Sequence, residues 1–317
     1  LIAASWARRA ELGLSPFAAI GGAGILAKAA QARRLALPVK EIASLAEAIA
    51  VFPTALPVLA GPDADYTPGK PASAGAKAAL ASLERGAALA LAGEASALVT
   101  MPVAKAELAE VGFDFPGQTE FLAAACAMGA QDAVMMLAGP SLRAVPLTVH
   151  CPLSEVPASL SIDLIVRKGR VVAEALRRDF GIAEPRLAVC GLNPHAGEQG
   201  RIGHEDRLII APAIMKLRAQ GIAATGPHPA DAIFAPRARA SYDAALAMYH
   251  DQALIPVKAL DFDQGVNVTL GLPIVRTSPD HGTAFDIAGK GLADEGATVA
   301  ALRMAAECAA RRADLVA

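Results

Sequence analysis

Short apolar runs of strand length alternate with helix-like segments along the whole chain, and this alternation constrains the fold more than any other feature. Several runs are apolar at consecutive positions, as strands are when helices cover both faces of a sheet. The segments between them carry apolar residues at intervals of three and four, the period of an amphipathic helix. The pattern predicts an α/β fold with a largely parallel sheet. The expected strands lie at 16–20, 97–100, 133–137, 143–149, 186–191, 245–248 and 266–270, and the expected helices at 73–92, 162–179, 206–220 and 297–312.

Length and composition agree with such a fold. A chain of 317 residues with 54% hydrophobic and 19% charged side chains can bury a large core. Because single cores rarely grow beyond roughly 250–300 residues, we expect two α/β domains. The first would comprise residues 1–138 and 272–317, and the second residues 139–271. A formal charge of −2 and 4% aromatic residues indicate neither a nucleic-acid partner nor a membrane surface.

The four cysteines are spread singly and form no CxxC pair. This usage is typical of reduced thiols in a cytoplasmic protein. No apolar run reaches the roughly 18 residues of a membrane span. The first residues read as the interior of a helix rather than as a leader, so we expect a strand and a loop to precede Leu1.

Three apolar runs end abruptly in a histidine, and these are the strongest candidate site residues. LTVHCP places His150 after one strand, CGLNPHAGEQG places His195 after a second, and AMYHDQ places His250 after a third. Ligand sites of α/β proteins gather at the carboxyl ends of parallel strands, so the three imidazoles can converge there. They would leave a divalent cation with open positions for water or substrate. The alternative is that each histidine is only a hydrogen-bonded residue at a loop entrance.

The other three histidines are weaker candidates. His204 and His228 stand in polar or proline-flanked loops and are expected to be solvated. His281, in SPDHGTAFDIAG, precedes a helix start and can either line a pocket or cap that helix.

Two helix starts carry polar residues suited to binding anions. In ALVTMPVAKAEL a strand is followed by a helix with Lys105 in its first turns, and in FPGQTEFLAAA the residues Gln118 and Thr119 open a helix. Unpaired backbone N–H groups at a helix start favour an anion.

Lys258, Asn267 and Arg276 follow at near-regular distances. Asn267 stands inside the apolar GVNVTLGLP, where a buried and unpaired amide costs about 1–3 kcal/mol, so it needs a partner. Together with the helix starts, these residues can hold a phosphate and a carboxylate. The alternative for Lys105 and Lys258 is a solvated surface lysine.

Common nucleotide-binding and hydrolase signatures are absent from the sequence. GGAGILAKAA, from Gly21, lacks the third glycine of a dinucleotide-binding loop. Neither GxxxxGK[ST] nor GxSxG occurs, so the sequence does not support a Ser/His/Asp hydrolase.

The long strings around these residues resemble the 4-hydroxythreonine-4-phosphate dehydrogenase family of pyridoxal phosphate (vitamin B6) biosynthesis. The resemblance covers essentially the whole chain and is carried by unusual strings rather than by single residues. They are TMPVAKAEL, TVHCPL, CGLNPHAGEQG, PADAIF with Asp231, AMYHDQALIPVK and GVNVTLGLPIVRTSPDHGTA.

The resemblance implies a fold like that of isocitrate and isopropylmalate dehydrogenases, which bind NAD without a Rossmann fingerprint. It implies a homodimer whose active site lies in the domain cleft and draws on both subunits. His150, His195 and His250 match the family's metal-binding histidines. The substrate-contacting positions are matched by Gln118, Thr119, Lys258, Asn267 and Arg276.

One departure from the family pattern concerns Gln118. The family commonly has GHTEF where this chain has GQTEF, so Gln118 replaces a substrate-contacting histidine. Glutamine can donate a hydrogen bond but carries no charge and exchanges no proton near neutral pH. An acid/base role at this position is therefore not expected, whereas a binding role is. The family's N-terminal GDPAGIGPE-like loop is not in this sequence.

The reaction implied is oxidation of 4-phosphooxy-L-threonine by NAD, or by NADP, followed by loss of CO₂ to give 3-amino-2-oxopropyl phosphate. One divalent metal (Zn, Mg or Co) per site would assist both steps. Lys258 is the first candidate for proton transfer and Asp231 the second.

Two alternatives stay open at this point. A paralogous dehydrogenase for 4-phospho-D-erythronate, D-threonate or a cis-dihydrodiol carboxylate would keep the three histidines and change the anion pocket. A metal- or nucleotide-binding protein without catalysis would bind NAD and metal but turn over no phosphorylated hydroxy acid. A phosphotransacetylase-like acyl transferase would need a coenzyme A site, for which the sequence gives no support.

Overall fold

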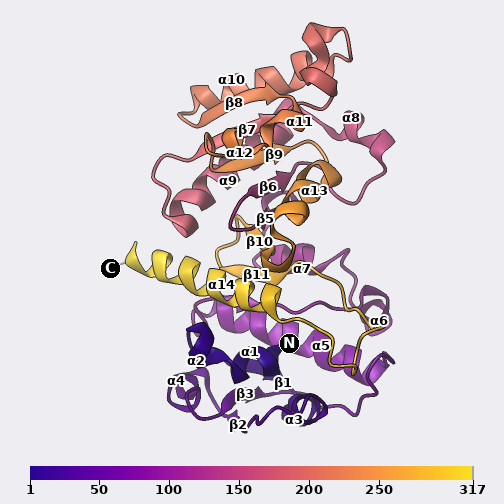
Figure 1. The fold of residues 1–317 in the computed structure, drawn as a ribbon, viewed down its shortest axis with the longest axis vertical. Coiled ribbons are helices and arrows are strands. Elements are labelled where there is room, and N and C mark those ends of the chain that lie inside the picture. The colour runs from indigo at the N-terminus through magenta and orange to yellow at the C-terminus, as the bar shows by residue number, and fades with distance from the viewer. Residues whose placement is uncertain (316–317) are drawn as a thin grey trace. The chain divides into compact units, whose positions relative to one another are not determined.

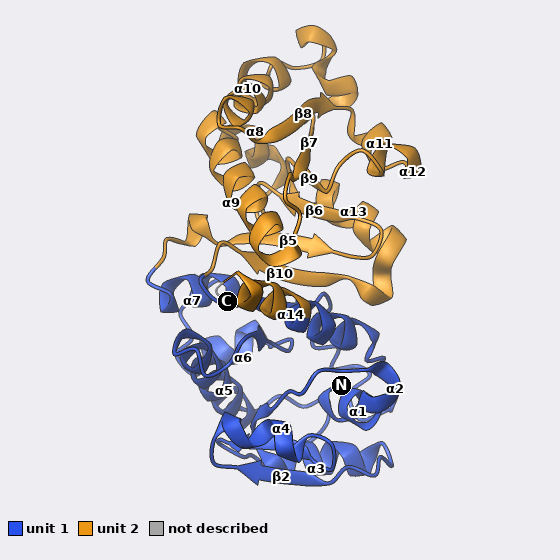
Figure 2. Cartoon of the chain, turned by 90° about the vertical axis from the view of Figure 1, so that its left-hand side faces the viewer, with its two compact units in different colours: residues 1–127, 273–306 blue, residues 128–272, 307–317 orange. Residues whose placement is uncertain are grey.

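The computed structural model describes residues 1–315 and divides the chain into two units (Figure 2). Unit 1 comprises residues 1–127 and 273–306, and unit 2 comprises residues 128–272 and 307–317. The first boundary lies eleven residues before the expected one at 138/139. The second lies at 272/273, and the end of the C-terminal helix belongs to unit 2 rather than to unit 1.

Unit 1 contains a small parallel sheet and two further paired strands. Strands β1 (Ala19–Gly21), β3 (Leu56–Ala60) and β2 (Val39–Ile42) lie in that order, with β3 in the centre and Leu56 and Val58 fully buried. Strand β4 (Leu98–Val99) pairs in parallel with β11 (Arg276–Pro279). The helices of this unit are α1 (Ile2–Ala7), α2 (Arg9–Leu12), α3 (Ala23–Ala32), α4 (Ala48–Val51), α5 (Ser73–Leu91), α6 (Lys105–Ala109), α7 (Gln118–Ala125) and the first turns of α14 (Gly296–Asp314).

Unit 2 is built on one larger sheet. Its strands follow the order β10 (Val266–Leu270), β5 (Val134–Ala138), β6 (Arg143–Pro146), β9 (Ala244–Ala247), β7 (Arg186–Cys190) and β8 (Ala223–His228), which Figure 1 shows as a stack. Helices lie on both faces (Figure 2), with α9 against β5, β7 and β10 and α13 against β5, β6 and β9. The helices are α8 (Val156–Ser159), α9 (Ile162–Phe180), α10 (Ala211–Ala219), α11 (Ala230–Ile233), α12 (Pro236–Arg239), α13 (His250–Asp261) and the end of α14.

The sheet of unit 2 is mixed. Strands β6, β9, β7 and β8 run parallel, as the sequence predicts, but β5 is antiparallel to both β6 and β10. The sheet of unit 2 is therefore largely parallel, as predicted, with β5 as its antiparallel strand. Only four residues, 139–142, join β5 to β6, and so short a link permits only an antiparallel pair. Asp261 stabilises this link, because its Oδ2 accepts a hydrogen bond from Ser141 N at 2.9 Å.

Helix α9 illustrates how the sequence sets an element of this unit. The Ser161 Oγ accepts a hydrogen bond from Leu164 N at 3.1 Å and so caps the start of the helix. The helix buries Ile165, Val172 and Leu176 against the sheet. It ends at Gly181, whose φ of 68° glycine adopts without steric cost.

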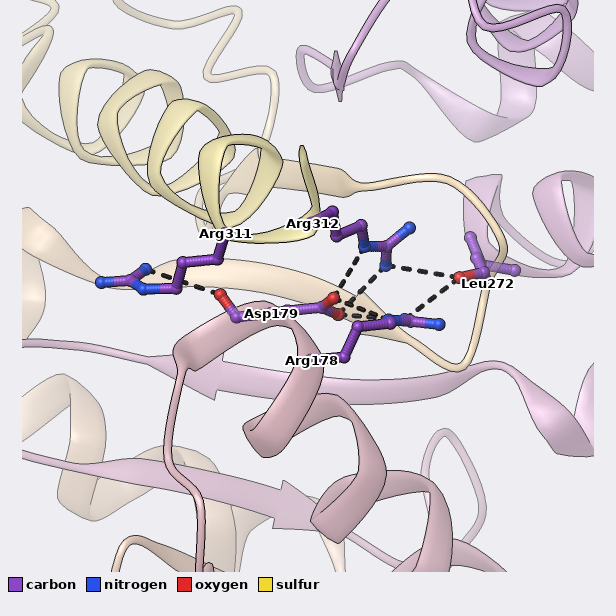
Figure 3. A network of polar contacts seen from close by, with 5 residues as sticks. All are labelled: Arg178, Asp179, Leu272, Arg311 and Arg312. Carbon is purple, nitrogen blue, oxygen red and sulfur yellow. Dashed lines mark hydrogen bonds and ion pairs between the residues drawn. The ribbon is translucent and has the colours of Figure 1, made fainter. Parts of the chain in front are cut away.

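A buried carboxylate explains why the end of α14 belongs to unit 2 (Figure 3). Asp179 is 4% exposed and accepts hydrogen bonds from Arg178 and Arg312, whose guanidinium groups also donate to Leu272 O. Burial alone would raise the pKa of Asp179, but the hydrogen bonds from the two arginines outweigh it and the net pKa is lowered. The network joins α9, α14 and the end of β10 within one unit.

Four strands are absent from the sequence prediction: β2, β3, β8 and β11. Strand β8 contains Gly226 and Pro227, which disguise it as a loop. Strand β11 reads Arg-Thr-Ser-Pro, yet all four residues are buried. Its polar groups are paired: Thr277 Oγ1, for example, donates to Ala301 O at 2.9 Å. Hydrophobicity therefore does not identify this strand.

The four cysteines are free thiols, with Cys190 and Cys308 buried. Among residues 1–315, we find no helix that combines the length and the apolar character needed to cross a bilayer.

Candidate active site

The three strands that precede His150, His195 and His250 are neighbours in the sheet of unit 2. Strand β9 pairs in parallel with β6 on one side and with β7 on the other. Residues after their carboxyl ends therefore emerge at one edge of the sheet, as predicted. Two hydrogen bonds link the three chain segments there. Thr148 Oγ1 donates to Met248 O at 2.8 Å, and the buried Gln252 donates from Nε2 to Gly191 O at 2.9 Å.

His150 and His250 face each other across this edge. Their ring centroids are 5.9 Å apart, and both side chains line a hollow. His250 begins α13, while His150 lies in the bend after β6 with a φ of 50°. The hollow is lined by Thr148, Val149, His150, Cys151, Leu153, Val156, Tyr249, His250 and Asp251.

A carboxylate fixes the tautomer of His250. The Nδ1 of His250 lies 2.7 Å from Asp251 Oδ1. Because an ionised carboxylate can only accept a hydrogen bond, the neutral imidazole carries its proton on Nδ1 and keeps a lone pair on Nε2. The arrangement of carboxylate and imidazole is the one that orients histidines for metal binding.

His195 lies at the same edge but outside the pair. It is exposed, and it stands in a 3₁₀-like turn, η4 (Pro194–Gly200), with a φ of 53°. In the described part of the chain, no group of three or more His, Cys, Asp or Glu side chains has the spacing of a metal site. The structure thus brings two of the three predicted histidines together and places the third on a neighbouring loop.

Three further predicted residues belong to unit 2. Lys258 lies in α13, about two turns beyond His250, and is half-buried. Asp231 is exposed in α11. Asn267 lies in β10, where its Oδ1 is buried and accepts no hydrogen bond within residues 1–315. The partner that the sequence predicts for this amide is therefore not a protein group of the described chain.

Arg276 is the centre of the candidate anion site in unit 1. It is 4% exposed, and its Nε and Nη2 donate to Thr100 Oγ1 at 3.2 and 2.8 Å. Gln118 accepts from Arg276 Nη2 at 3.4 Å and donates from Nε2 to Met101 O at 3.1 Å. Burial lowers the pKa of Arg276 to about 10, against the opposing effect of Glu120, so the guanidinium stays charged at neutral pH.

The other two helix-start residues lie close to this cluster in the chain. Thr119 is the second residue of α7, directly after Gln118, and Lys105 is the first residue of α6. Lys105 is exposed, and its Nζ approaches Gly117: a β-carbon built on that glycine would be 3.7 Å away. The lysine ammonium therefore lies near the start of α7.

The remaining histidines make local contacts. His228 is the last residue of β8 rather than a loop residue, and its Nε2 lies 2.8 Å from Thr225 Oγ1. Burial lowers the pKa of His228. His281 is exposed with its Nδ1 3.0 Å from Gly282 O, and His204 is exposed in a loop. We find no role for these three in the site.

The sequence did not predict three residues whose side chains bind the backbone near the candidate site. Gln252, Asp206 and Lys168 each contact backbone at the carboxyl edge of the sheet. Lys168, in α9, donates to Leu147 O at 2.9 Å, and burial lowers its pKa to about 8. Gln252 could have been noticed as an amide inside AMYHDQALIP, but the other two sit in ordinary polar helix positions.

Comparisons with known proteins bear on the family and the fold of the chain. The model of the family described as "Pyridoxal phosphate biosynthetic protein PdxA" matches residues 14–305. The 4-hydroxythreonine-4-phosphate dehydrogenase of Erythrobacter litoralis is 65% identical over 314 residues, which are 99% of this chain and 94% of that protein.

Two solved structures extend the comparison. The crystal structure of 4-hydroxythreonine-4-phosphate dehydrogenase from Klebsiella pneumoniae is 36% identical, with a TM-score of 0.82 over 92% of this chain and 88% of that one. A terephthalate 1,2-cis-dihydrodiol dehydrogenase from Burkholderia xenovorans is 30% identical, with a TM-score of 0.63 over 96% and 92% of the two chains. The predicted α/β class is thereby confirmed, and the mixed sheet agrees with an isocitrate dehydrogenase-like fold.

Proposed function

The chain belongs to the PdxA family of pyridoxal phosphate biosynthetic proteins, and from this membership we propose its reaction, its site residues and its assembly. It is a 4-hydroxythreonine-4-phosphate dehydrogenase, an oxidoreductase whose family implies a nicotinamide cofactor. The single observation that carries this assignment is the 65% identity to a protein of that name along nearly the full length of both chains.

The finer reaction is oxidation of the substrate hydroxyl with NAD or NADP, followed by loss of CO₂ to give 3-amino-2-oxopropyl phosphate. The nicotinamide accepts the hydride from the carbon that bears the hydroxyl. The oxidation also releases the hydroxyl proton. Because the carboxylate is bonded to the carbon next to the new ketone, the oxidised substrate is a β-keto acid, which loses CO₂ and leaves an enolate that takes up a proton at that carbon. The protein must therefore bind two anionic groups, accept one proton and deliver one.

Arg276, Gln118 and Thr119 bind the anionic groups of the substrate. The guanidinium of Arg276 is held by Thr100 and Gln118, so no reorganisation is needed when an anion arrives. Its burial strengthens the attraction to a charged oxygen. Gln118 contributes through its amide and, lacking a titratable group, moves no proton.

His150, His195 and His250 are the residues that would hold a divalent cation (Zn, Mg or Co). The donor types fit Zn or Co better than Mg, because imidazole nitrogens bind transition-metal cations whereas Mg prefers oxygen ligands. In the neutral form of His250, the hydrogen bond to Asp251 leaves Nε2 with its lone pair. The Oδ1 of Asn267 is buried and accepts no hydrogen bond within residues 1–315, so a hydrogen-bond donor of the substrate can pair with it. A bound cation would lower the pKa of the substrate hydroxyl and stabilise the enolate left by CO₂.

Lys258 is the residue we assign to proton transfer. As an ammonium, its Nζ can donate to the carbon from which CO₂ has left, and it lies on the same helix as His250. Asp231 is the second candidate, although its exposure makes it the less constrained of the two. The active form is a homodimer in the cytoplasm whose site draws on both subunits.

The assignment is tested by NADH formation with purified protein. We expect turnover with 4-hydroxythreonine-4-phosphate, formation of CO₂ in equal amount, and loss of activity on chelation that added Zn²⁺ or Co²⁺ restores. Turnover unaffected by exhaustive chelation would contradict the metal-binding role.

A second candidate substrate class is favoured by one residue, Gln118, which stands at the family's histidine position. The same assay with 4-phospho-D-erythronate, D-threonate and a cis-dihydrodiol carboxylate decides between them. We expect 4-hydroxythreonine-4-phosphate to have the highest kcat/KM. In the variant Gln118→His, we expect this preference to persist and a new pH dependence to appear near the pKa of about 6.5 of histidine.

A further inference from the structure

The loop that carries His195 has a left-handed backbone conformation. Five successive residues, His195, Ala196, Gly197, Glu198 and Gln199, have φ between 42° and 78°. These angles lie in the left-handed region, where a β-carbon crowds the following carbonyl oxygen. Four of the five carry a side chain, so glycine's freedom relieves only one position.

Such a turn is costly and needs support from outside itself. Each non-glycine residue in this conformation costs roughly 1–2 kcal/mol. Packing of the turn does not supply the support, because His195, Glu198 and Gln199 are exposed and only Gly197 is buried. Strain of this kind persists where surrounding groups fix the backbone, and it is concentrated at functional sites.

Asp206 supplies the support. It is 2% exposed, and its carboxylate accepts three hydrogen bonds from the residues that lead into the turn. Leu192 N donates to Oδ1 at 2.9 Å, while Asn193 N and Asn193 Nδ2 donate to Oδ2 at 3.2 and 2.9 Å. The Asn193 amide also donates to Glu205 Oε2 at 2.8 Å.

Two glycines allow the carboxylate to approach the loop. A β-carbon on Gly191 would stand 2.7 Å from Asp206 Oδ1, and one on Gly197 would stand 3.1 Å from Oδ2. The loop is therefore folded around this carboxylate at both its start and its middle. Asp206 itself opens a π-helical turn, η5 (Asp206–Ile210), a feature frequent at functional sites.

We propose that Asp206 is a positioning residue that holds the left-handed turn Pro194–Gly200 and thereby sets the position of the His195 imidazole at the site. This rests on the proposed function only for the task of His195, which is to bind the cation. The clamping of the loop by Asp206 does not depend on that function.

Asp243 provides a matched control, because it contacts the other end of strand β7. Asp243 is also a carboxylate that accepts a backbone N–H and side-chain donors: Arg186 N donates to its Oδ2 at 2.8 Å, and Arg186 Nη2 donates to its Oδ1 at 3.0 Å. Arg186 begins β7, whereas Asp206 binds the residues that follow β7. The variants Asp206→Asn and Asp243→Asn therefore make the same chemical change at opposite ends of one strand.

The experiment measures hydrogen exchange and Co²⁺ affinity on the full-length protein. In D206N, we expect faster amide exchange in the peptide 192–203, and Co²⁺ affinity reduced 10- to 100-fold in calorimetry, as for other residues that orient a metal ligand. In D243N, we expect exchange at 192–203 and Co²⁺ affinity within twofold of the wild type. Should D206N not fold, Asn193→Ala removes a single donor and is expected to shift both readouts in the same direction.

The outcomes separate the inference from the proposed function. Unchanged exchange at 192–203 in D206N, or equal loss of Co²⁺ affinity in D206N and D243N, would overturn the positioning role. If the wild type binds no Co²⁺ while D206N still shows faster amide exchange at 192–203, the role of Asp206 in holding the loop is supported and the metal-binding role of His195 is contradicted.

Discussion

The two units hold their candidate site residues by opposite means. In unit 1, Arg276 is buried and is held by side chains, with Thr100 and Gln118 as partners. In unit 2, His150 and His195 are exposed and are held by the backbone, each at a positive φ. A guanidinium that must attract an anion gains from desolvation, whereas an imidazole that must bind a cation needs an accessible nitrogen. Burial suits the first task and a fixed backbone suits the second.

The largest effect should come from removing an imidazole. We expect His250→Ala to abolish detectable NADH formation with 4-hydroxythreonine-4-phosphate, because the site would lose one of its three proposed metal ligands. The matched control is His228→Ala, which removes a histidine at the end of β8 in the same sheet. Near-normal turnover in H250A, or equal losses in both variants, would show that the carboxyl edge of the unit 2 sheet, with His150 and His250, is not the catalytic part of the molecule.

A smaller but still large effect is expected in unit 1. Arg276→Lys keeps the charge but cannot reproduce the fork that donates twice to Thr100. We expect kcat/KM to fall about 10²- to 10³-fold, the range seen when one anion-stabilising donor is lost. Steady-state kinetics at several substrate concentrations check this. The exposed Lys105, changed to Arg as a control, should alter kcat/KM by less than tenfold; a reversed order of effects would contradict the contrast between buried and exposed cations.

The sequence predicted site residues that stand out in a local pattern and missed those defined by contacts between distant parts of the chain. His150 and His250 were predicted because a polar residue at the end of an apolar strand is visible in the chain itself, whereas Arg276 was predicted only from its spacing after Lys258 and Asn267 and from the family resemblance. Asp206 and Lys168 were not found, because their partners are backbone groups 13 and 21 residues away that only the folded chain brings near. No local pattern records such a contact.

The elements divide similarly. The strands β5, β6, β7, β9 and β10 were predicted because they are short apolar runs. Strand β11 was missed because its buried residues are polar. The direction of β5 was not predicted, because a four-residue link decides it rather than the strand sequence. Asn267 lies between these cases: its need for a partner was predicted, and the described chain supplies none for its Oδ1.

A moderate, pH-dependent effect on stability is expected from Lys168, which donates to the backbone just after β6. Burial lowers the pKa of Lys168 to about 8, below the value of 10.5 for a solvated lysine. Between these two values the unfolded chain binds more protons than the folded one, so the contribution of Lys168 to stability rises with pH from about 8 to about 10.5.

In Lys168→Met this contribution is absent. We expect the difference in unfolding free energy, wild type minus K168M, to be constant below pH 7 and to increase by at most about 1.4 kcal/mol per pH unit above pH 8. Urea denaturation at a series of pH values measures it. A difference that stays flat up to pH 10 would mean that Lys168 keeps its solvated pKa and is not a buried support of β6.

The smallest effect concerns the strained turn, and it separates strain from side-chain contact. Gln199 is exposed with a φ of 60°, a conformation that glycine adopts freely and alanine does not. We therefore expect Gln199→Gly to raise the free energy of unfolding by up to about 1 kcal/mol, while Gln199→Ala, which loses the same side chain but keeps the β-carbon, leaves it nearly unchanged. Equal stabilities for the two variants would mean that the turn is unstrained at this position.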